Sequence, residues 1–145
     1  MALQSNLAVM QCLDAQIDLL EDAILKQARL KPEFHALRTV SGIGEILALT
    51  IALETGDINR FETPGNFASY ARTNTKCGNK HLAWAFVEAA HFAVRYDTQI
   101  KRWYQKKAAK TLPVVAIKAV AHKLARACYH ILKTGEPFEV GRAFS

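Results

Sequence analysis

The chain has 145 residues, half of them hydrophobic, and a formal net charge of +6 at pH 7. This length can bury one core, alone or beside an extended helix. No apolar run reaches the roughly 18 residues that a membrane span needs, and the N-terminus lacks the features of a secretory signal peptide. We therefore expect a cytoplasmic protein without membrane spans.

Residues 1–31 carry a heptad pattern. Apolar side chains recur at alternating spacings of three and four, and four acidic residues lie off that seam. The seam consists of Leu3, Met10, Leu13, Ile17, Leu20 and Ile24. This pattern predicts a coiled-coil helix that continues to Lys31 and stops at Pro32. The seam could join two chains as a homodimer or pack within one chain, because a heptad does not identify its partner helix.

The run from Leu37 to Ala48 sets Gly42, Ile43 and Gly44 between apolar segments, which is the pattern of a helix-hairpin-helix. Both glycines can take positive φ and allow close approach of the backbone to another surface. Backbone N–H groups at the start of the second helix would then favour a DNA phosphate. The alternative is a tight turn between packed helices, with Ile43 filling the core.

The rest of the chain is predicted to be helical around one polar loop. Residues 45–54 are apolar nearly all round, which predicts a central core helix ending at Gly56. Thr63 is expected to cap a short helix that begins at Pro64, and residues 72–79 form the loop. Further helices are expected over residues 80–96, over 98–110 and from 113 to about 134. In the last one the predicted core stripe is Val114, Ile117, Val120, Ala121, Leu124, Cys128 and Ile131.

The expected fold class is therefore all-α. It comprises a coiled-coil or dimerisation helix over residues 1–31, a helical DNA-binding bundle with the hairpin over residues 32–135, and a C-terminal tail over residues 136–145. Three cysteines, Cys12, Cys77 and Cys128, are odd in number and far apart, so we expect reduced thiols in place of small buried hydrophobes. Cys77 and His81 have a spacing that metal ligands can share, but no second pair accompanies them, so no metal site is expected.

Charge is divided unevenly along the chain. Residues 1–63 hold five Lys and Arg against nine Asp and Glu, whereas residues 64–145 hold fourteen against four. Nine basic residues and no acidic ones lie between Ile100 and Lys133. Such a field repels itself unless a polyanion or solvent accommodates it, so nucleic acid is the default partner and a solvated helix face is the alternative.

Several blocks of sequence closely resemble the C-terminal domain of the insertion-sequence one-ten family of transposases, the Piv/MooV-type recombinases. The main block runs from Lys76 to Ala90, after Phe67-Ala68-Ser69-Tyr70-Ala71-Arg72. Further blocks are Ile100-Lys101-Arg102-Trp103-Tyr104 and residues 115–126, and the likeness covers about residues 37–133. It implies a role in transposition in a bacterial cytoplasm, on the nucleoid when bound to DNA. DNA is the implied partner, and some members of the family are directed by a structured guide RNA.

The family implies more chemistry than this chain carries. Its full-length members join a RuvC-like domain with metal-binding carboxylates to a helical domain with a serine nucleophile, so Mg²⁺ is expected only in the RuvC-like domain, which is absent here. The serine loop of the family is replaced by Thr73-Asn74-Thr75, and a threonine without an adjacent base is a poor nucleophile. We therefore expect no catalytic residue, no metal ligand and no cofactor in this chain.

Three hypotheses follow: a DNA-binding transposase domain that does not cleave alone, an active serine recombinase, and a dimerising remnant that inhibits a transposase. The missing serine loop argues against the second, and the heptad seam supports the third. The residues expected to contact DNA are Gly42, Ile43, Gly44, Arg72, Lys76, Asn79, Lys80, Lys101, Arg102, Lys106, Lys107 and Lys110.

Overall fold

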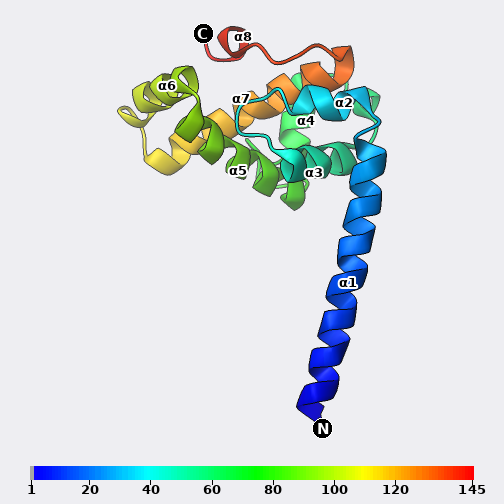
Figure 1. Cartoon of the computed structure of the whole chain (residues 1–145). Helices are drawn as coiled ribbons and strands as arrows, with labels where there is room; N and C mark the ends of the chain where they lie inside the picture. The colour runs from blue at the N-terminus through cyan, green and yellow to red at the C-terminus, as the bar shows by residue number, and fades with distance from the viewer. Residues whose placement is uncertain (1) are drawn as a thin grey trace. The chain divides into compact units, whose positions relative to one another are not determined.

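The computed structural model describes residues 2–145, and these fold into helices and connecting turns without a β-strand (Figure 1). The all-α fold class is thus confirmed. The chain divides into two compact units, Met1–Lys31 and Pro32–Ser145. The first unit contains α1 (Ala2–Ala28). The second contains α2 (Pro32–Leu37), α3 (Glu45–Thr55), the 3-10 helix η1 (Ile58–Arg60), α4 (Pro64–Tyr70), α5 (Lys80–Tyr96), α6 (Thr98–Ala108), α7 (Pro113–Thr134) and α8 (Val140–Ala143).

Helix α1 has no buried residue. The predicted seam runs along it with exposed fractions from 40% at Ile24 to 83% at Leu3. The helix ends at Ala28, before the predicted end at Lys31, and a turn closes it with a hydrogen bond from the Lys31 amide to the Ala28 carbonyl. The first unit therefore presents an amphipathic helix whose apolar side has no partner within that unit.

The turn between α2 and α3 packs closely on α5. Gly42 has φ +91°, and a Cβ on it would overlap the Ala89 carbonyl oxygen and lie 2.6 Å from the Ala93 amide nitrogen. Ile43 is 4% exposed, so its side chain fills the core as the packing alternative expected. Gly44 has φ −82°, so of the two glycines only Gly42 adopts the positive φ that both can take.

Helix α3 is buried on one face only. Leu47, Ala48 and Ile51 are buried between α2 and α5, whereas Ile46 and Leu53 are 56% and 62% exposed. The prediction of a central core helix therefore holds for one face of α3 and is wrong for the other. Its sequence is apolar on both sides, but the second unit supplies neighbouring helices to only one of them.

Helices α5 and α7 form the centre of the second unit. Helix α7 packs against α2, α4, α5 and α6, and α5 also packs against α3 and α6 (Figure 1). Small side chains on α5 permit this close packing, since Ala89, Ala90 and Ala93 are all fully buried. The predicted core stripe of α7 is confirmed from Ile117 to Ile131, but Val114 in the first turn is 69% exposed, so that part of the prediction is wrong.

Local sequence signals fix most helix ends. The Thr63 hydroxyl accepts a hydrogen bond from the Asn66 amide, with Pro64 at the first helical position of α4. Asp97 caps α6 through the amides of residues 99 and 100. Gly135 ends α7 in the left-handed conformation, with φ +72°. These ends agree with the capping preferences of each residue type.

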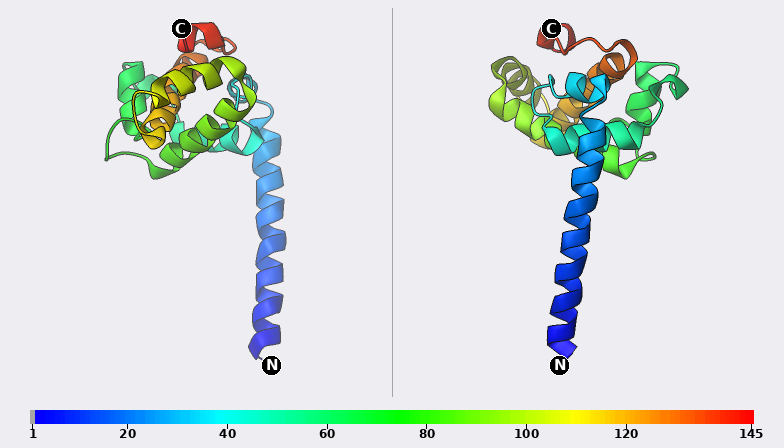
Figure 2. Two further views of the ribbon diagram at one scale, coloured as in Figure 1. Left: turned by 90° about the vertical axis from the view of Figure 1, so that its left-hand side faces the viewer. Right: turned by 45° about the vertical axis from the view of Figure 1, so that its right-hand side comes forward.

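The C-terminal residues expected to form a tail fold back on the second unit and include α8. In Figure 2 this segment, in red, lies beside α7, in orange, and the two helices are in contact. Phe144 is 4% exposed, and its ring meets Trp103 edge-on at 5.6 Å between centroids. The Phe138 amide donates to the Thr39 hydroxyl at 2.9 Å.

All three cysteines are free thiols, but they differ in environment. Cys128 is buried, as predicted, and burial raises the pKa of its thiol. Cys12 and Cys77 are exposed, so the expectation that they replace small buried hydrophobes is wrong. Cys12 lies on α1, which has no buried residue, and Cys77 lies in the loop before α5.

Candidate nucleic-acid interface

Five basic side chains lie on α6 and the turn that follows it. They are Lys101, Arg102, Lys106, Lys107 and Lys110, and all five are exposed. Within residues 2–145 none of them forms an ion pair, and the ion pairs that do occur on the second half of the chain belong to Arg142. The one acid at this helix, Asp97, is already used by the amides that it caps and by the Ser41 hydroxyl, which donates to it at 2.9 Å. These five side chains therefore form an exposed cationic surface on α6 and its following turn, without an ion-paired acid among residues 2–145.

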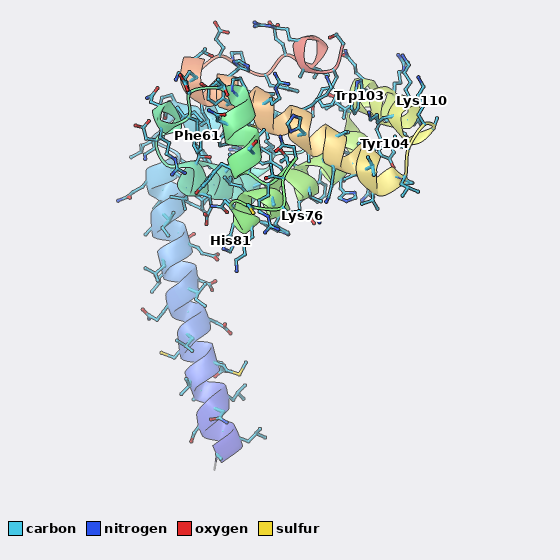
Figure 3. The ribbon with its side chains drawn as sticks, turned by 180° about the vertical axis from the view of Figure 1, so that it is seen from behind. Phe61, Lys76, His81, Trp103, Tyr104 and Lys110 are labelled. Atoms are coloured by element: carbon cyan, nitrogen blue, oxygen red, sulfur yellow. The ribbon has the colours of Figure 1, made fainter. Side chains whose placement is uncertain are left out.

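A second basic group lies at the loop before α5. Arg72, Lys76 and Lys80 are all exposed. Figure 3 shows Lys76 on this loop and Lys110 at the far end of α6, so these two basic groups lie in separate places. Arg72 has φ +53°, a left-handed conformation that costs a non-glycine residue on the order of 1–2 kcal/mol.

The loop is held to α4 by hydrogen bonds. The Thr75 hydroxyl oxygen lies 2.7 Å from the Cys77 carbonyl oxygen and 3.1 Å from the Ser69 carbonyl oxygen, and its one proton is shared between these two acceptors. Gly78 has φ +126°, and a Cβ on it would overlap the Tyr70 carbonyl oxygen. The amide of Asn79 donates to the same carbonyl at 2.6 Å. Most of the loop is thus exposed, and its backbone is hydrogen-bonded to the end of α4.

Asn79 is a structural residue as well as a predicted DNA contact. Its Oδ1 accepts from the amides of residues 81 and 82, which confirms that it caps α5. Its Nδ2 donates to Glu54 Oε2 at 2.6 Å and lies 3.4 Å from the Tyr70 hydroxyl. The hydrogen bond from Asn79 and the nearby Arg60 lower the pKa of Tyr70. Both ends of the Asn79 amide are therefore already engaged within the protein.

A cationic hollow of about 270 Å³ separates the loop from α5 and α7. It is lined by Arg72, Thr73, Thr75, Lys76, Ala83, Val87, Lys118 and Ala121. At its edge the Thr73 hydroxyl lies 3.1 Å from His122 Nδ1 and 2.8 Å from the Ala68 carbonyl, to which it donates. The expectation that Thr73 has no adjacent base is therefore wrong, because α7 brings an imidazole beside it.

The imidazole of His122 favours its neutral form. Partial burial lowers its pKa, and the neighbouring cations Arg126 and Lys123 lower it further. Neutral imidazole carries one N–H and one acceptor nitrogen. Because Thr73 donates its proton to the Ala68 carbonyl, the tautomer with the proton on Nδ1 fits this contact and donates to the Thr73 oxygen. Sequence reasoning missed this pair, since the two residues are 49 positions apart and no motif connects them.

The glycine turn contributes less to an open interface than the sequence suggested. The Gly42 backbone and the Ile43 side chain are used in packing against the core. Gly44 is exposed, with open space where a Cβ would lie, and precedes the first turn of α3. Glu45, in that first turn, puts a negative charge where an anion would bind.

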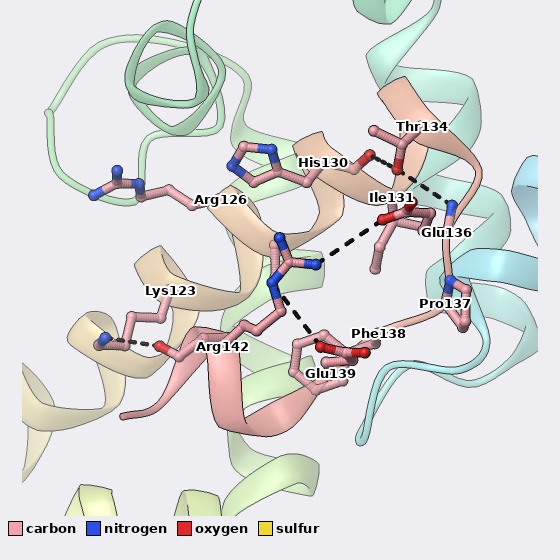
Figure 4. A pocket seen from close by; sticks show the side chains of 12 residues that line it. Lys123, Arg126, His130, Ile131, Thr134, Glu136, Pro137, Phe138, Glu139 and Arg142 are labelled. Carbon is pink, nitrogen blue, oxygen red and sulfur yellow. Dashed lines mark hydrogen bonds and ion pairs between the residues drawn. The ribbon is translucent and has the colours of Figure 1, made fainter.

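A larger hollow of about 450 Å³, which no sequence pattern predicted, lies between α7 and the C-terminal segment (Figure 4). Its walls carry Arg126 and His130 from α7 and Arg142 from α8. Arg142 lies 4.0 Å from Glu136 and 3.9 Å from Glu139, and these two acids compensate its charge. Lys123 closes one end by donating to the Ala143 carbonyl at 2.7 Å.

Acidic residues near the loop serve as hydrogen-bond acceptors. Glu54 accepts from Asn79, and Asp57 caps η1 by accepting from the Asn59 amide.

Over residues 2–145, no group of three or more His, Cys, Asp or Glu side chains is placed to hold a metal ion. Over the same range, no helix has both the length and the hydrophobicity to cross a bilayer.

One comparison with known proteins identifies a relationship. Residues 34–76 match the family model described as the transposase IS116/IS110/IS902 family. The matched segment begins in α2, includes α3, η1 and α4, and ends in the loop before α5. No curated protein matches the chain. The match supports a role in transposition, and the similar blocks after residue 76 lie outside it.

Proposed function

We propose that this chain is a DNA-binding helical domain of a transposase that acts in DNA transposition and recombination of an insertion sequence. The observation that carries the proposal is the exposed cationic surface of α6, which has no acidic partner among residues 2–145. The family match to transposases supplies the biological context. Unpaired cations gathered on one helix are suited to a phosphate backbone.

The proposed binding is mainly electrostatic. Each phosphate neutralised in B-form DNA changes the slope of log affinity against log salt by about −0.9. Five contacts from α6 alone would give a slope of about −4.5, and contacts from the loop before α5 would make it steeper. Because the proposed contacts are with phosphates and not with base edges, we expect little sequence preference.

Charge removal on α6 tests the proposal directly. Lys106→Gln combined with Lys107→Gln should lower the affinity for a fluorescently labelled duplex and reduce the salt slope by about two. A matched control removes the same charge from the first unit by Lys26→Gln combined with Lys31→Gln. Equal losses for the two double variants would refute α6 as the interface. A structured RNA offers the same phosphates, so competition by an RNA hairpin measures any preference for a guide RNA.

We also propose that the chain forms a homodimer through α1. Six large seam side chains are 40–83% exposed, and burying a side chain of this kind contributes roughly 1.5–3 kcal/mol. A second copy offers the same seam, so the contact is self-complementary.

The charges beside the seam favour a parallel arrangement. With Ile17 at an a position, Asp14 and Glu21 occupy e positions. In a parallel pair they face the neutral g residues Val9 and Gln16. In an antiparallel pair with Ile17 opposite Leu20 of the other copy, Asp14 would face Glu21 of that copy, and like charges repel.

An inhibitory role is the second candidate, and the exposed seam of α1 supports it. A chain that binds DNA and pairs with an intact transposase of the same seam would occupy transposon ends without cutting them. Co-expression with such a transposase distinguishes the two functions. Inhibition requires that transposition falls with the unmodified chain and recovers with Ile17→Asp, whereas a purely DNA-binding domain would inhibit equally with both.

A further inference from the structure

We infer that the hollow between the loop before α5 and helix α7 is a binding site for a single phosphate group, and that the phosphate is one of the DNA backbone. This inference rests on the proposed DNA-binding function and locates one of its contacts. It adds Lys118, which is not among the individual residues expected to contact DNA.

Three cations from two parts of the fold converge on this hollow. Arg72 and Lys76 come from the loop, and Lys118 comes from α7. No Asp or Glu lines the hollow, and none of the three cations forms an ion pair within residues 2–145. The larger hollow beside the C-terminal segment differs, because Glu136 and Glu139 already compensate Arg142 there. The smaller hollow therefore has the stronger attraction for an anion.

The walls leave room for a group of this size. Ala83 from α5 and Ala121 from α7 are small, and with Val87 they form the apolar side of a hollow of about 270 Å³. The polar side carries Thr73 and Thr75, whose hydroxyls are already oriented by the protein. Their protons are directed to backbone carbonyls, so the three cations are the groups that would hold the phosphate oxygens.

The loop is held in its shape before any ligand binds. The Thr73 hydroxyl is fixed between the Ala68 carbonyl and His122. The backbone of Gly78 packs closely against the end of α4. Arg72 is kept in the left-handed conformation that a non-glycine residue avoids. Strain of this kind persists where the surrounding structure enforces it, often at binding sites. Binding would therefore cost little loop ordering.

His122 gives the site a reporter that does not depend on DNA. Its Nδ1 lies 3.1 Å from the Thr73 hydroxyl, so an anion at that hydroxyl changes the electrostatic environment of the imidazole. The experiment follows the side-chain ¹⁵N resonances of His122 during titration with inorganic phosphate, at constant ionic strength maintained with chloride. We expect saturable shifts in the unmodified chain.

Two variants separate the site from general charge effects. Lys118→Gln removes one cation, and Ala83→Leu fills the hollow without changing charge; both should abolish the saturable shift. Lys133→Gln is the matched control, since it removes the same charge from α7 outside the hollow. Retention of the shift in Lys118→Gln and Ala83→Leu, with folding confirmed by circular dichroism, would overturn the inference.

Duplex binding completes the test and distinguishes the two claims. Lys118→Gln should reduce the magnitude of the salt slope by about one. When salt is raised from 50 to 200 mM, the affinity of this variant should then fall by a factor roughly 3.5 times smaller than the affinity of the unmodified chain does. Lys133→Gln should leave the slope unchanged. If the unmodified chain does not bind duplex DNA, the proposed function fails. If it binds and the slope of Lys118→Gln equals that of the control, the phosphate site alone fails.

Discussion

Gly42 is the position where a one-atom change most sharply tests the packing of the turn between α2 and α3. An added Cβ would overlap the carbonyl oxygen of Ala89 and lie 2.6 Å from the amide nitrogen of Ala93. Both atoms belong to the backbone of a central helix, which cannot move aside as a flexible side chain does. The residue also has φ +91°, where a side chain is strained whatever the space.

The expected destabilisation of Gly42→Ala is the sum of these two effects. Forcing a non-glycine residue to positive φ costs about 1–2 kcal/mol, and inserting a methyl group into a packed site costs about 1–3 kcal/mol. Together they give about 3 kcal/mol, against the 5–15 kcal/mol typical of a domain. With a urea slope of about 1.5 kcal/mol/M, the unfolding midpoint should fall by about 2 M.

Gly44→Ala is the matched control, two residues along the same turn. Gly44 has φ −82° and open space where the Cβ would lie, so this variant should unfold within a few tenths of a kcal/mol of the unmodified chain. Urea denaturation followed by circular dichroism compares the two. Equal midpoints for Gly42→Ala and Gly44→Ala would refute the account of this turn as a packed contact with α5.

Three other predictions concern oligomeric state, pH and chemistry. Ile17→Asp should convert the proposed dimer to a monomer, because it puts a charge in the seam of α1. If light scattering shows that the unmodified chain is a monomer at tens of micromolar, the dimer proposal is refuted. Since the pKa of His122 is lowered on folding, the unfolded chain takes up this proton first, and stability should fall as pH drops below about 6.5. His122→Gln should flatten that fall in urea titrations at several pH values, and an unchanged pH profile would contradict the assignment. Incubated with supercoiled plasmid and Mg²⁺, the chain should produce neither nicks nor a covalent adduct. The reason is that the Thr73 hydroxyl is a secondary alcohol that already donates to the Ala68 carbonyl. An adduct at Thr73 on denaturing electrophoresis would show that the chain cleaves DNA.

The helix boundaries were predictable because their signals are local. Pro32, Pro64 and Pro113 each stand at the start of a helix, and Gly56 and Gly135 follow the ends of α3 and α7. A residue of this kind restricts or frees its own backbone, so its effect does not depend on the rest of the fold.

Burial was less predictable than helix formation. Ile46 and Leu53 on α3 and Val114 on α7 are as apolar as the core residues beside them, yet they are exposed. Hydrophobic periodicity shows which side chains share a face, but not whether another helix covers that face. Helix α8 was missed for the related reason that it has only four residues, and the residue that follows it, Phe144, packs against Trp103.

The candidate site shows the same division. The exposed cations of α6 follow from a basic helix, so the sequence was sufficient to nominate them. The meeting of Thr73 with His122, and of Lys118 with the loop before α5, depends on how α7 crosses the second unit. No spacing in the sequence reports that crossing, since these contacts join residues tens of positions apart.

The most direct test of the central claim is the salt dependence of duplex binding by the unmodified chain. Fluorescence anisotropy with a labelled duplex of mixed sequence, between 50 and 200 mM salt, gives the slope of log affinity against log salt. The account predicts binding with a slope of about −4.5 or steeper and similar affinities for unrelated duplexes. Absence of binding at 50 mM salt, or a slope near zero, would contradict it.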